Sequence, residues 1–273
     1  MMSYTMALGE WRHSKDIVRL CRFARELGLE AVDWLTTYGT PPAEVKKICD
    51  DHGLKIACYT FGADINFPDA KSRQPGIDKI KEGIETALML GTDKIMLPIS
   101  GKEGQSRQES RRNCIEGLKD AVLAGNRCGV TVTVEHFPNR LAPFIISSDM
   151  SEAIREVPGL KVTYDPGNAL TGGEDPVQAY LNSKDDIVFA HFKDFSLSDP
   201  ENSRLQGADG KYYISSLVGE GLIDYPAIVK AMTENNYKGY INFEYEGKKF
   251  TPEEAMVRGL PYLKKLFEEA ENG

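Results

Sequence analysis

The sequence lacks an excess of basic residues. Among its 273 residues, 33 are Lys or Arg and 41 are Asp or Glu, so the formal net charge is −8. A protein that binds DNA or RNA normally presents a basic face that neutralises phosphate groups. The charge balance therefore argues against a nucleic acid as the main partner.

Cysteine pairs and long apolar runs are missing as well. No two of the five cysteines have CxxC spacing and their number is odd, which argues against a disulfide framework or a zinc knuckle. No stretch approaches the roughly 20 apolar residues of a membrane span, and the first residues lack the apolar segment of a secretory signal. We therefore expect a cytoplasmic protein that does not contact a membrane.

What the sequence does contain is a regular alternation of strand and helix patterns. Eight short apolar runs are each followed by an amphipathic stretch, and we predict strands at residues 4–8, 30–34, 55–61, 93–99, 131–137, 161–167, 187–195 and 240–246. Pro41 and Pro42 favour a helix start, and Gly53, Gly91 and Gly129 favour helix ends. Eight parallel β/α units predict a (β/α)8 TIM barrel, an α/β fold formed by a single domain over residues 1–273.

An open, doubly wound sheet is the alternative architecture. Such a sheet normally carries a Gly-rich nucleotide loop after its first strand, and the segment ALGEWRH does not provide one. After the seventh strand, residues 196–216 are polar and show little periodicity. A connection of this length is either a lid or binding loop, or a plain surface insertion.

The last four predicted strands each place one ionisable residue on the barrel interior. Side chains alternate along a strand, and the apolar residues at every second position suit the helix layer. This parity turns Glu135, Asp165, His191 and Glu244 inward, each near the carboxyl end of its strand. Active sites of TIM barrels are built at that end. We therefore treat these four residues as the candidate site.

Three carboxylates and one imidazole at a barrel mouth repel one another unless a cation or shared protons compensate their charge. Oxygen and nitrogen donors together suit one divalent ion, Mn²⁺, Mg²⁺, Co²⁺ or Zn²⁺. Four ordinary rim groups that hydrogen-bond to loops are the alternative.

The same four residues carry a family resemblance. Glu135 in TVEHF, Asp165 in YDPGN, His191 in AHFKD and Glu244 in NFEYEG resemble the xylose isomerase-like TIM-barrel family, in the AP endonuclease family 2 superfamily. The family includes sugar isomerases, ketose 3-epimerases, hydroxypyruvate isomerase and inosose dehydratase. The segment VGEGLIDYPAIVKAM is also similar, since Gly219, Gly221 and Asp224 match a family GxGxxD pattern.

The resemblance implies a metal-dependent sugar isomerase or epimerase. The four residues would bind the metal ion, and the ion would polarise a carbonyl and stabilise an enediolate. Glu135 and Glu244 would exchange a carbon-bound proton with a small ketose or hydroxy-ketone. The oligomeric state stays open, a homo-oligomer included.

Further residues are candidates for substrate contact. Lys193 shares the parity of His191 and lies one inward step higher, and Arg204 lies in the long connection. Trp34 and Phe61, at early strand ends, would form an apolar wall. Asn168 stands where ketose 3-epimerases typically have a substrate-binding histidine, which leaves the 3-epimerase reaction open. Glu246 is the alternative fourth ligand.

Three other functions compete with this interpretation. An inosose-dehydratase-type lyase would use the same metal site but expel water. A DNA-repair nuclease of the same superfamily holds three metals with additional histidines, and this chain has four histidines in all. A non-catalytic sugar-binding relative would be expected to have lost part of the ligand set, and all four positions are occupied here.

Overall fold

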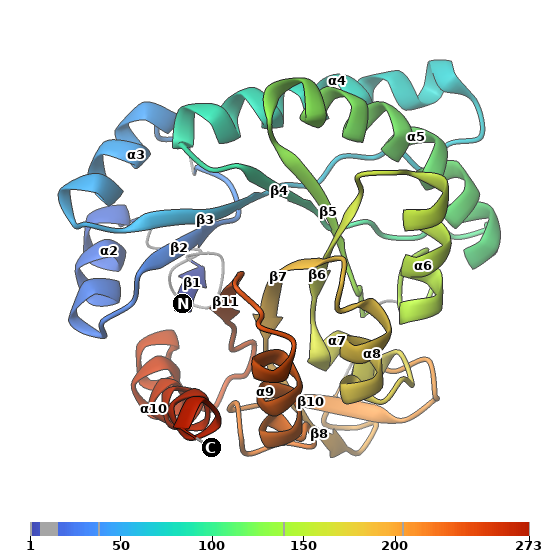
Figure 1. Cartoon of the computed structure of the whole chain (residues 1–273). Helices are drawn as coiled ribbons and strands as arrows, with labels where there is room; N and C mark the ends of the chain where they lie inside the picture. Colours follow the sequence, from blue (N-terminus) through green and yellow to red (C-terminus); the bar gives the residue numbers. More distant parts are fainter. Residues whose placement is uncertain (1, 6–15, 38, 139, 204, 273) are drawn as a thin grey trace.

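The computed structural model describes residues 2–5, 16–37, 39–138, 140–203 and 205–272. Eight parallel strands close into a barrel in the order β1-β11-β7-β6-β5-β4-β3-β2 (Figure 1). The barrel strands are β1 (Met2–Thr5), β2 (Ala31–Trp34), β3 (Lys55–Thr60), β4 (Lys94–Leu97), β5 (Thr131–Glu135), β6 (Lys161–Tyr164), β7 (Ile187–Phe192) and β11 (Tyr240–Phe243). The predicted TIM barrel is confirmed, and residues 6–8 of the first predicted strand lie outside the described residues.

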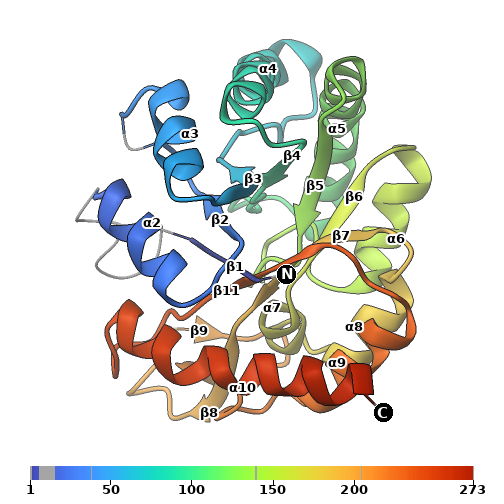
Figure 2. The same ribbon diagram turned by 60° about the vertical axis from the view of Figure 1, so that its left-hand side comes forward.

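Helices surround the barrel on its outer side (Figure 2). They are α2 (Ile17–Glu26), α3 (Pro42–Asp51), α4 (Ala70–Leu90), α5 (Arg107–Cys128), α6 (Ser147–Glu156), α7 (Pro166–Thr171), α8 (Pro176–Ser183), α9 (Tyr225–Glu234) and α10 (Pro252–Asn272). Gly91 and Gly129 end α4 and α5 in the left-handed conformation, as the sequence predicted. None of the described helices is long and apolar enough to cross a membrane.

The barrel walls separate two apolar regions. The larger core lies between strands and helices and includes the predicted outward residues Val132, Val134 and Val162. A small cluster fills the barrel interior and consists of Ala31, Ala57, Cys58, Met96 and Phe189. Above it, the hydroxyl groups of Thr133 and Thr163 lie 2.7 Å apart. The interior therefore becomes polar towards the carboxyl ends of β5 and β6.

The seventh predicted strand is shorter than expected. We predicted one strand over 187–195, but β7 ends at Phe192, and β8 (Asp194–Ser198) leaves the barrel. β8 pairs antiparallel with β10 (Tyr212–Ser216), which also pairs with β9 (Leu205–Gln206). The connection at 196–216 is therefore a small antiparallel sheet rather than an irregular loop.

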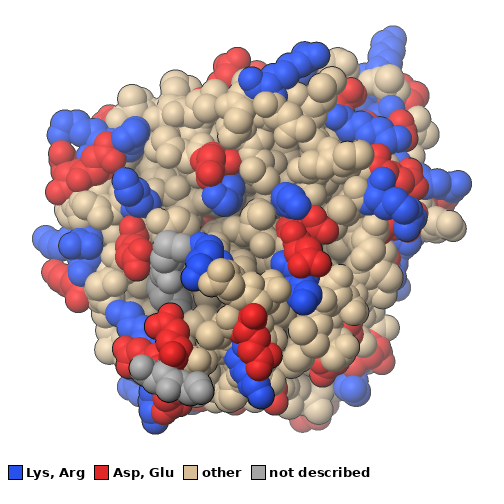
Figure 3. Space-filling model, in the orientation of Figure 1, with Lys and Arg blue, Asp and Glu red and all other residues tan. Residues whose placement is uncertain are grey.

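Basic and acidic side chains are interspersed on the face shown in Figure 3. The face shown offers no single-sign region of the kind that binds a polyanion.

Candidate metal centre

The four candidate residues lie at one end of the barrel. Glu135 is the last residue of β5, His191 lies near the end of β7, and Asp165 and Glu244 directly follow β6 and β11. Because carboxyl ends of parallel barrel strands meet at one mouth, four strands bring these side chains together. Each of the four is less than 8% exposed.

The imidazole of His191 is the centre of this cluster. Its Nδ1 lies 2.6 Å from Oε1 of Glu135 and 3.2 Å from Oε1 of Glu244. Glu135, Asp165 and His191 each place one donor atom within 4.8 Å of the others. Glu244 lies beside this trio through Oε1, and its other oxygen is paired with a lysine.

That lysine is Lys193, which is 4% exposed. Its Nζ lies 3.0 Å from Oδ2 of Asp165, 2.9 Å from Oε2 of Glu244 and 3.4 Å from Oε1 of Glu246. A Cβ on Gly167 would lie 2.6 Å from Cγ of Lys193, so the glycine of the DPGN motif leaves room for the lysine. The parity argument thus placed Lys193 correctly beside the cluster.

Asp165 has two separate roles in the local structure. It is the N-cap of α7, and its Oδ1 accepts a hydrogen bond from the backbone N–H of Asn168 at 2.9 Å. Its other oxygen is left facing Lys193. Asn168 is itself buried, and its Nδ2 donates to the carbonyl of His136 at 2.7 Å. Asn168 therefore ties the start of α7 to the end of β5, and a substrate contact by this residue stays a prediction.

Sequence reasoning missed Asp33 because it considered only the last four strands. Asp33 lies on β2, is 2% exposed, and places Oδ2 3.6 Å from Nε2 of His191. A signal was present in the segment AVDW. Asp33 shares the inward parity of Ala31, which belongs to the interior cluster, and a carboxylate in a buried strand is rare without a partner.

The buried groups shift one another's proton affinity. Burial raises the pKa of Asp165 well above its usual range and that of Asp33 to about 7. Burial lowers the pKa of His191, but Glu244, Glu135 and Asp33 outweigh it and raise the value to about 10. The pKa of Lys193 is raised for the same reason, chiefly by Asp165 and Glu244 against the effect of burial. The cluster therefore stabilises positive charge.

A divalent metal ion fits the cluster only if both the charge and the donor atoms of the cluster suit it. Asp33, Glu135, Asp165 and Glu244 are four buried carboxyl groups that face one ammonium and one imidazole. The donor atoms are oxygen and nitrogen, the mixture that suits Mn²⁺, Mg²⁺, Co²⁺ or Zn²⁺. Both the charge and the donor set fit a divalent cation.

The structure corrects the positions predicted for two of the substrate-contact residues. Trp34 is fully buried in the core between strands and helices, on the face of β2 opposite Asp33. Phe61 packs on α4, where its ring leaves no room for a Cβ on Gly83. Neither forms a wall of the mouth. Arg204 lies outside the described residues.

Asp194, which follows Lys193, and the GxGxxD pattern have a structural role. Oδ2 of Asp194 accepts hydrogen bonds from the backbone N–H groups of Gly219 and Gly221, each at 3.0 Å. A Cβ on Gly221 would lie 2.1 Å from Oδ1 of Asp194, so this position needs glycine. Asp224 caps α9 through the N–H of Ala227. Asp194 and the two glycines of the GxGxxD pattern therefore hold the chain where it leaves β7.

A cavity of about 960 Å³ lies beside the cluster, between the small antiparallel sheet and the segment that follows β11. Glu246 connects the two, because it lines the cavity and contacts Lys193. Apolar and charged side chains form part of the lining, together with hydroxyl and amide side chains from Ser196, Asn202, Ser203, Ser215 and Ser216. Such groups suit a ligand that carries hydroxyls.

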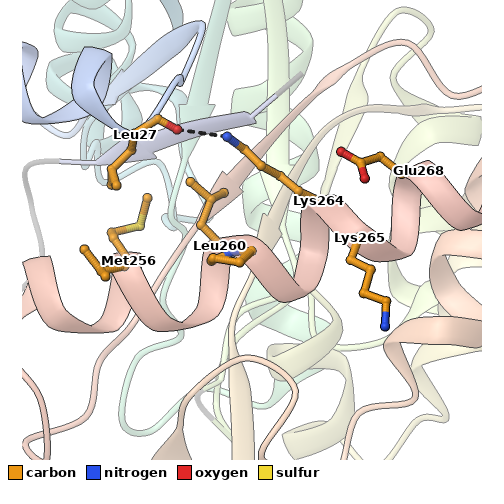
Figure 4. Close-up of a pocket in the computed structure, with 8 residues that line it drawn as sticks. Leu27, Met256, Leu260, Lys264, Lys265 and Glu268 are labelled. Carbon is orange, nitrogen blue, oxygen red and sulfur yellow. Dashed lines mark hydrogen bonds between the residues drawn. The ribbon is translucent and has the colours of Figure 1, made fainter.

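A second cavity, of about 300 Å³, lies along the outer helix α10 (Figure 4). Its lining includes Leu27, Met256 and Leu260, and Nζ of Lys264 donates to the carbonyl of Leu27 at 2.8 Å. None of the cluster residues lines this cavity, so it is separate from the candidate centre.

The whole chain is similar to several known proteins. Residues 21–266 match the family described as xylose isomerase-like TIM barrel. The chain is 26% identical to 2-oxo-tetronate isomerase of Haemophilus influenzae, over 89% of this chain and 90% of that protein. It is 33% identical to inosose dehydratase of Geobacillus kaustophilus, over 81% and 77% of the two chains. The solved structure of an L-ribulose 3-epimerase superposes with a TM-score of 0.79 at 14% identity, covering 99% of this chain and 95% of that one, which shows a shared fold.

Proposed function

Because the chain belongs to the xylose isomerase-like TIM barrel family, we propose that it is a divalent-metal-dependent isomerase or epimerase of a small sugar or hydroxy-ketone. One observation carries the proposal: Glu135, Asp165 and His191 gather donor atoms within 4.8 Å of one another, buried at the barrel mouth. Glu244 and Lys193 lie directly beside them.

A bound divalent ion would be held by Glu135, Asp165, His191 and Glu244, and would supply a Lewis acid that polarises a substrate carbonyl. The chain's own groups perform the proton transfers. Glu135 and Glu244 both approach Nδ1 of His191, so each presents a carboxylate to the same small volume. One takes a proton from the carbon next to the carbonyl and the other returns one.

Lys193 contributes a positive charge at a fixed place. Its ammonium lies between Asp165 and Glu244 and is shielded from water. In this position it donates a hydrogen bond to a substrate oxygen on which negative charge develops. The hydroxyl-lined cavity next to Glu246 accommodates the part of the substrate that does not react.

Dehydration is the second candidate function. The 33% identical relative is an inosose dehydratase, and the first step, removal of a carbon-bound proton, is the same. The ammonium of Lys193 then protonates a departing hydroxyl instead of stabilising an oxygen that stays. The product distinguishes the two reactions, because dehydration yields a carbon–carbon double bond and loses one water.

Incubation of Mn²⁺- or Mg²⁺-loaded protein with a panel of ketoses in D₂O tests both candidates. An isomerase or epimerase places deuterium on a carbon next to the carbonyl, seen by NMR and mass spectrometry. A dehydratase gives an alkene signal and a product lighter by one water. Glu135→Gln should abolish either reaction. Glu116→Gln, the same change at an exposed residue of the outer helix α5, is the matched control and should retain it. Absence of exchange and of dehydration across the panel contradicts the proposal.

A further inference from the structure

Asp33 is a buried carboxyl group that faces the cluster but that the proposed chemistry does not use. It lies on β2, across the barrel interior from His191 on β7. Its Oδ1 has no hydrogen-bond partner among the described residues, and its Oδ2 faces Nε2 of His191. A carboxyl group in this environment is costly unless it interacts with a specific partner.

The two nitrogens of His191 face different neighbours. Nδ1 faces the oxygens of Glu135 and Glu244, where the donor trio gathers. Nε2 faces Asp33 at 3.6 Å and has no hydrogen-bond partner in the described part of the chain. The edge of the ring packs on Phe189, with centroids 4.9 Å apart, which limits how the ring can rotate.

We propose that Asp33 is a positioning residue that fixes the tautomer of His191. A histidine binds a metal only through a nitrogen without a proton, so the other nitrogen must carry it. A carboxylate opposite Nε2 keeps the proton there and leaves the lone pair of Nδ1 available to an ion held by Glu135 and Asp165. The inference rests on the proposed metal site and adds a fifth residue, from the opposite side of the barrel.

The geometry also explains why a neighbour of Nδ1 cannot take this role. Glu135 and Glu244 lie on the ligand side of the ring. Nδ1 is within hydrogen-bond distance of Oε1 of Glu135, at 2.6 Å, and a proton in that contact occupies the nitrogen that must bind the ion, so the contact has to open when an ion binds. Asp33 is the carboxyl group on the other side, and its Oδ2 lies 3.6 Å from Nε2, within ion-pair distance.

The test compares Co²⁺ affinity of the wild type with that of Asp33→Ala and Asp33→Asn, by chelator competition followed through the Co²⁺ absorption spectrum. Loss of an outer partner of a metal-binding histidine typically weakens binding by about 10–100-fold. We expect that loss for Asp33→Ala and a smaller one for Asp33→Asn, whose amide oxygen still accepts a hydrogen bond. Thr60→Val, which removes a buried hydroxyl at the end of the neighbouring strand β3, should leave affinity unchanged.

A spectroscopic measurement separates orientation from general damage. In the Zn²⁺-loaded protein labelled with ¹⁵N-histidine, the wild type should show His191 with a protonated, slowly exchanging Nε2. Asp33→Ala should lose this slow exchange while its circular dichroism spectrum stays folded. Folded Asp33→Ala with wild-type Co²⁺ affinity overturns the inference alone. A wild type that binds no Co²⁺ overturns the proposed function together with the inference.

Discussion

The two halves of the barrel interior differ in chemistry although they share one fold. Strands β2, β3 and β4 contribute four of the five members of the small apolar cluster, and β7 contributes Phe189 below its charged residues; the four are Ala31, Ala57, Cys58 and Met96. Strands β5, β6, β7 and β11 bring the ionisable residues to the mouth, either within the strand or directly after it; these are Glu135, Asp165, His191, Lys193 and Glu244.

This difference shows how the fold divides its tasks. Small and apolar side chains fill one half and stabilise the barrel through burial. The other half keeps charged groups buried, which lowers stability and creates a volume that favours a cation. Asp33 is the exception, because it carries a carboxyl group from the apolar half to the imidazole of the charged half.

Substitutions in the two halves should have very different effects, and the largest is expected at Glu135. Glu135→Gln keeps the side-chain shape but removes a ligand charge and a proton acceptor. We expect metal content to fall from about one ion per chain to near zero, and kcat/KM by about 10²–10⁴-fold. Metal analysis and steady-state kinetics measure both. Met96→Leu, in the apolar half, should keep metal and activity, and a loss of both there would break the division.

Replacing Lys193 should show whether its ammonium, which neutralises Asp165 and Glu244, supports metal binding or competes with the ion. In Lys193→Met the ammonium no longer competes with an ion for Asp165 and Glu244. We expect unchanged or tighter Mn²⁺ binding in a titration, together with a fall in kcat/KM of about 100-fold. Weaker Mn²⁺ binding would show that Lys193 supports the centre instead of competing with the ion.

The pH dependence of metal binding sharpens the account of the charged half. The pKa of His191 is raised to about 10. Without a metal ion the ring is therefore an imidazolium at neutral pH, with a proton on each nitrogen. Metal binding must release one of these protons, and the apparent affinity should rise by about tenfold per pH unit between pH 6 and 9. Calorimetry in buffers of different ionisation enthalpy counts the protons. An affinity independent of pH over this range would contradict the raised pKa.

The smallest effect is expected for Phe61, which packs on α4 away from the mouth. Phe61→Leu should lower the free energy of unfolding by about 1 kcal/mol through poorer packing and leave KM unchanged. Thermal unfolding and kinetics are the measurements. A raised KM with unchanged stability would instead support the substrate wall that the sequence suggested.

The repeat of strands and helices was predictable because alternation and helix-end glycines are local signals. The inward direction of Glu135 and Asp165 followed from the same alternation. Phe61 was predicted to line the mouth only from its place at a strand end, which does not reveal that β2 and β3 shift register, so that Val32 pairs with Ile56 but Asp33 with Cys58. The extra residue in β3 reverses the parity of the residues that follow it.

Other features depend on contacts that are distant in the sequence. The end of β7 is set by Asp194, whose carboxylate binds backbone N–H groups of Gly219 and Gly221. Asp33 meets His191 only because the barrel closes, which brings residues 158 positions apart (191 − 33) to 3.6 Å. The residue pattern within one β-strand does not indicate which distant residues it will contact.

Anomalous diffraction from crystals soaked in Mn²⁺ or Co²⁺ tests the central claim most directly. The account predicts one strong peak at the barrel mouth, bound at roughly 2.0–2.2 Å by oxygens of Glu135 and Asp165 and by Nδ1 of His191, with Glu244 completing the ligand set. A mouth without a peak at saturating metal, with Lys193 still between Asp165 and Glu244, would contradict it.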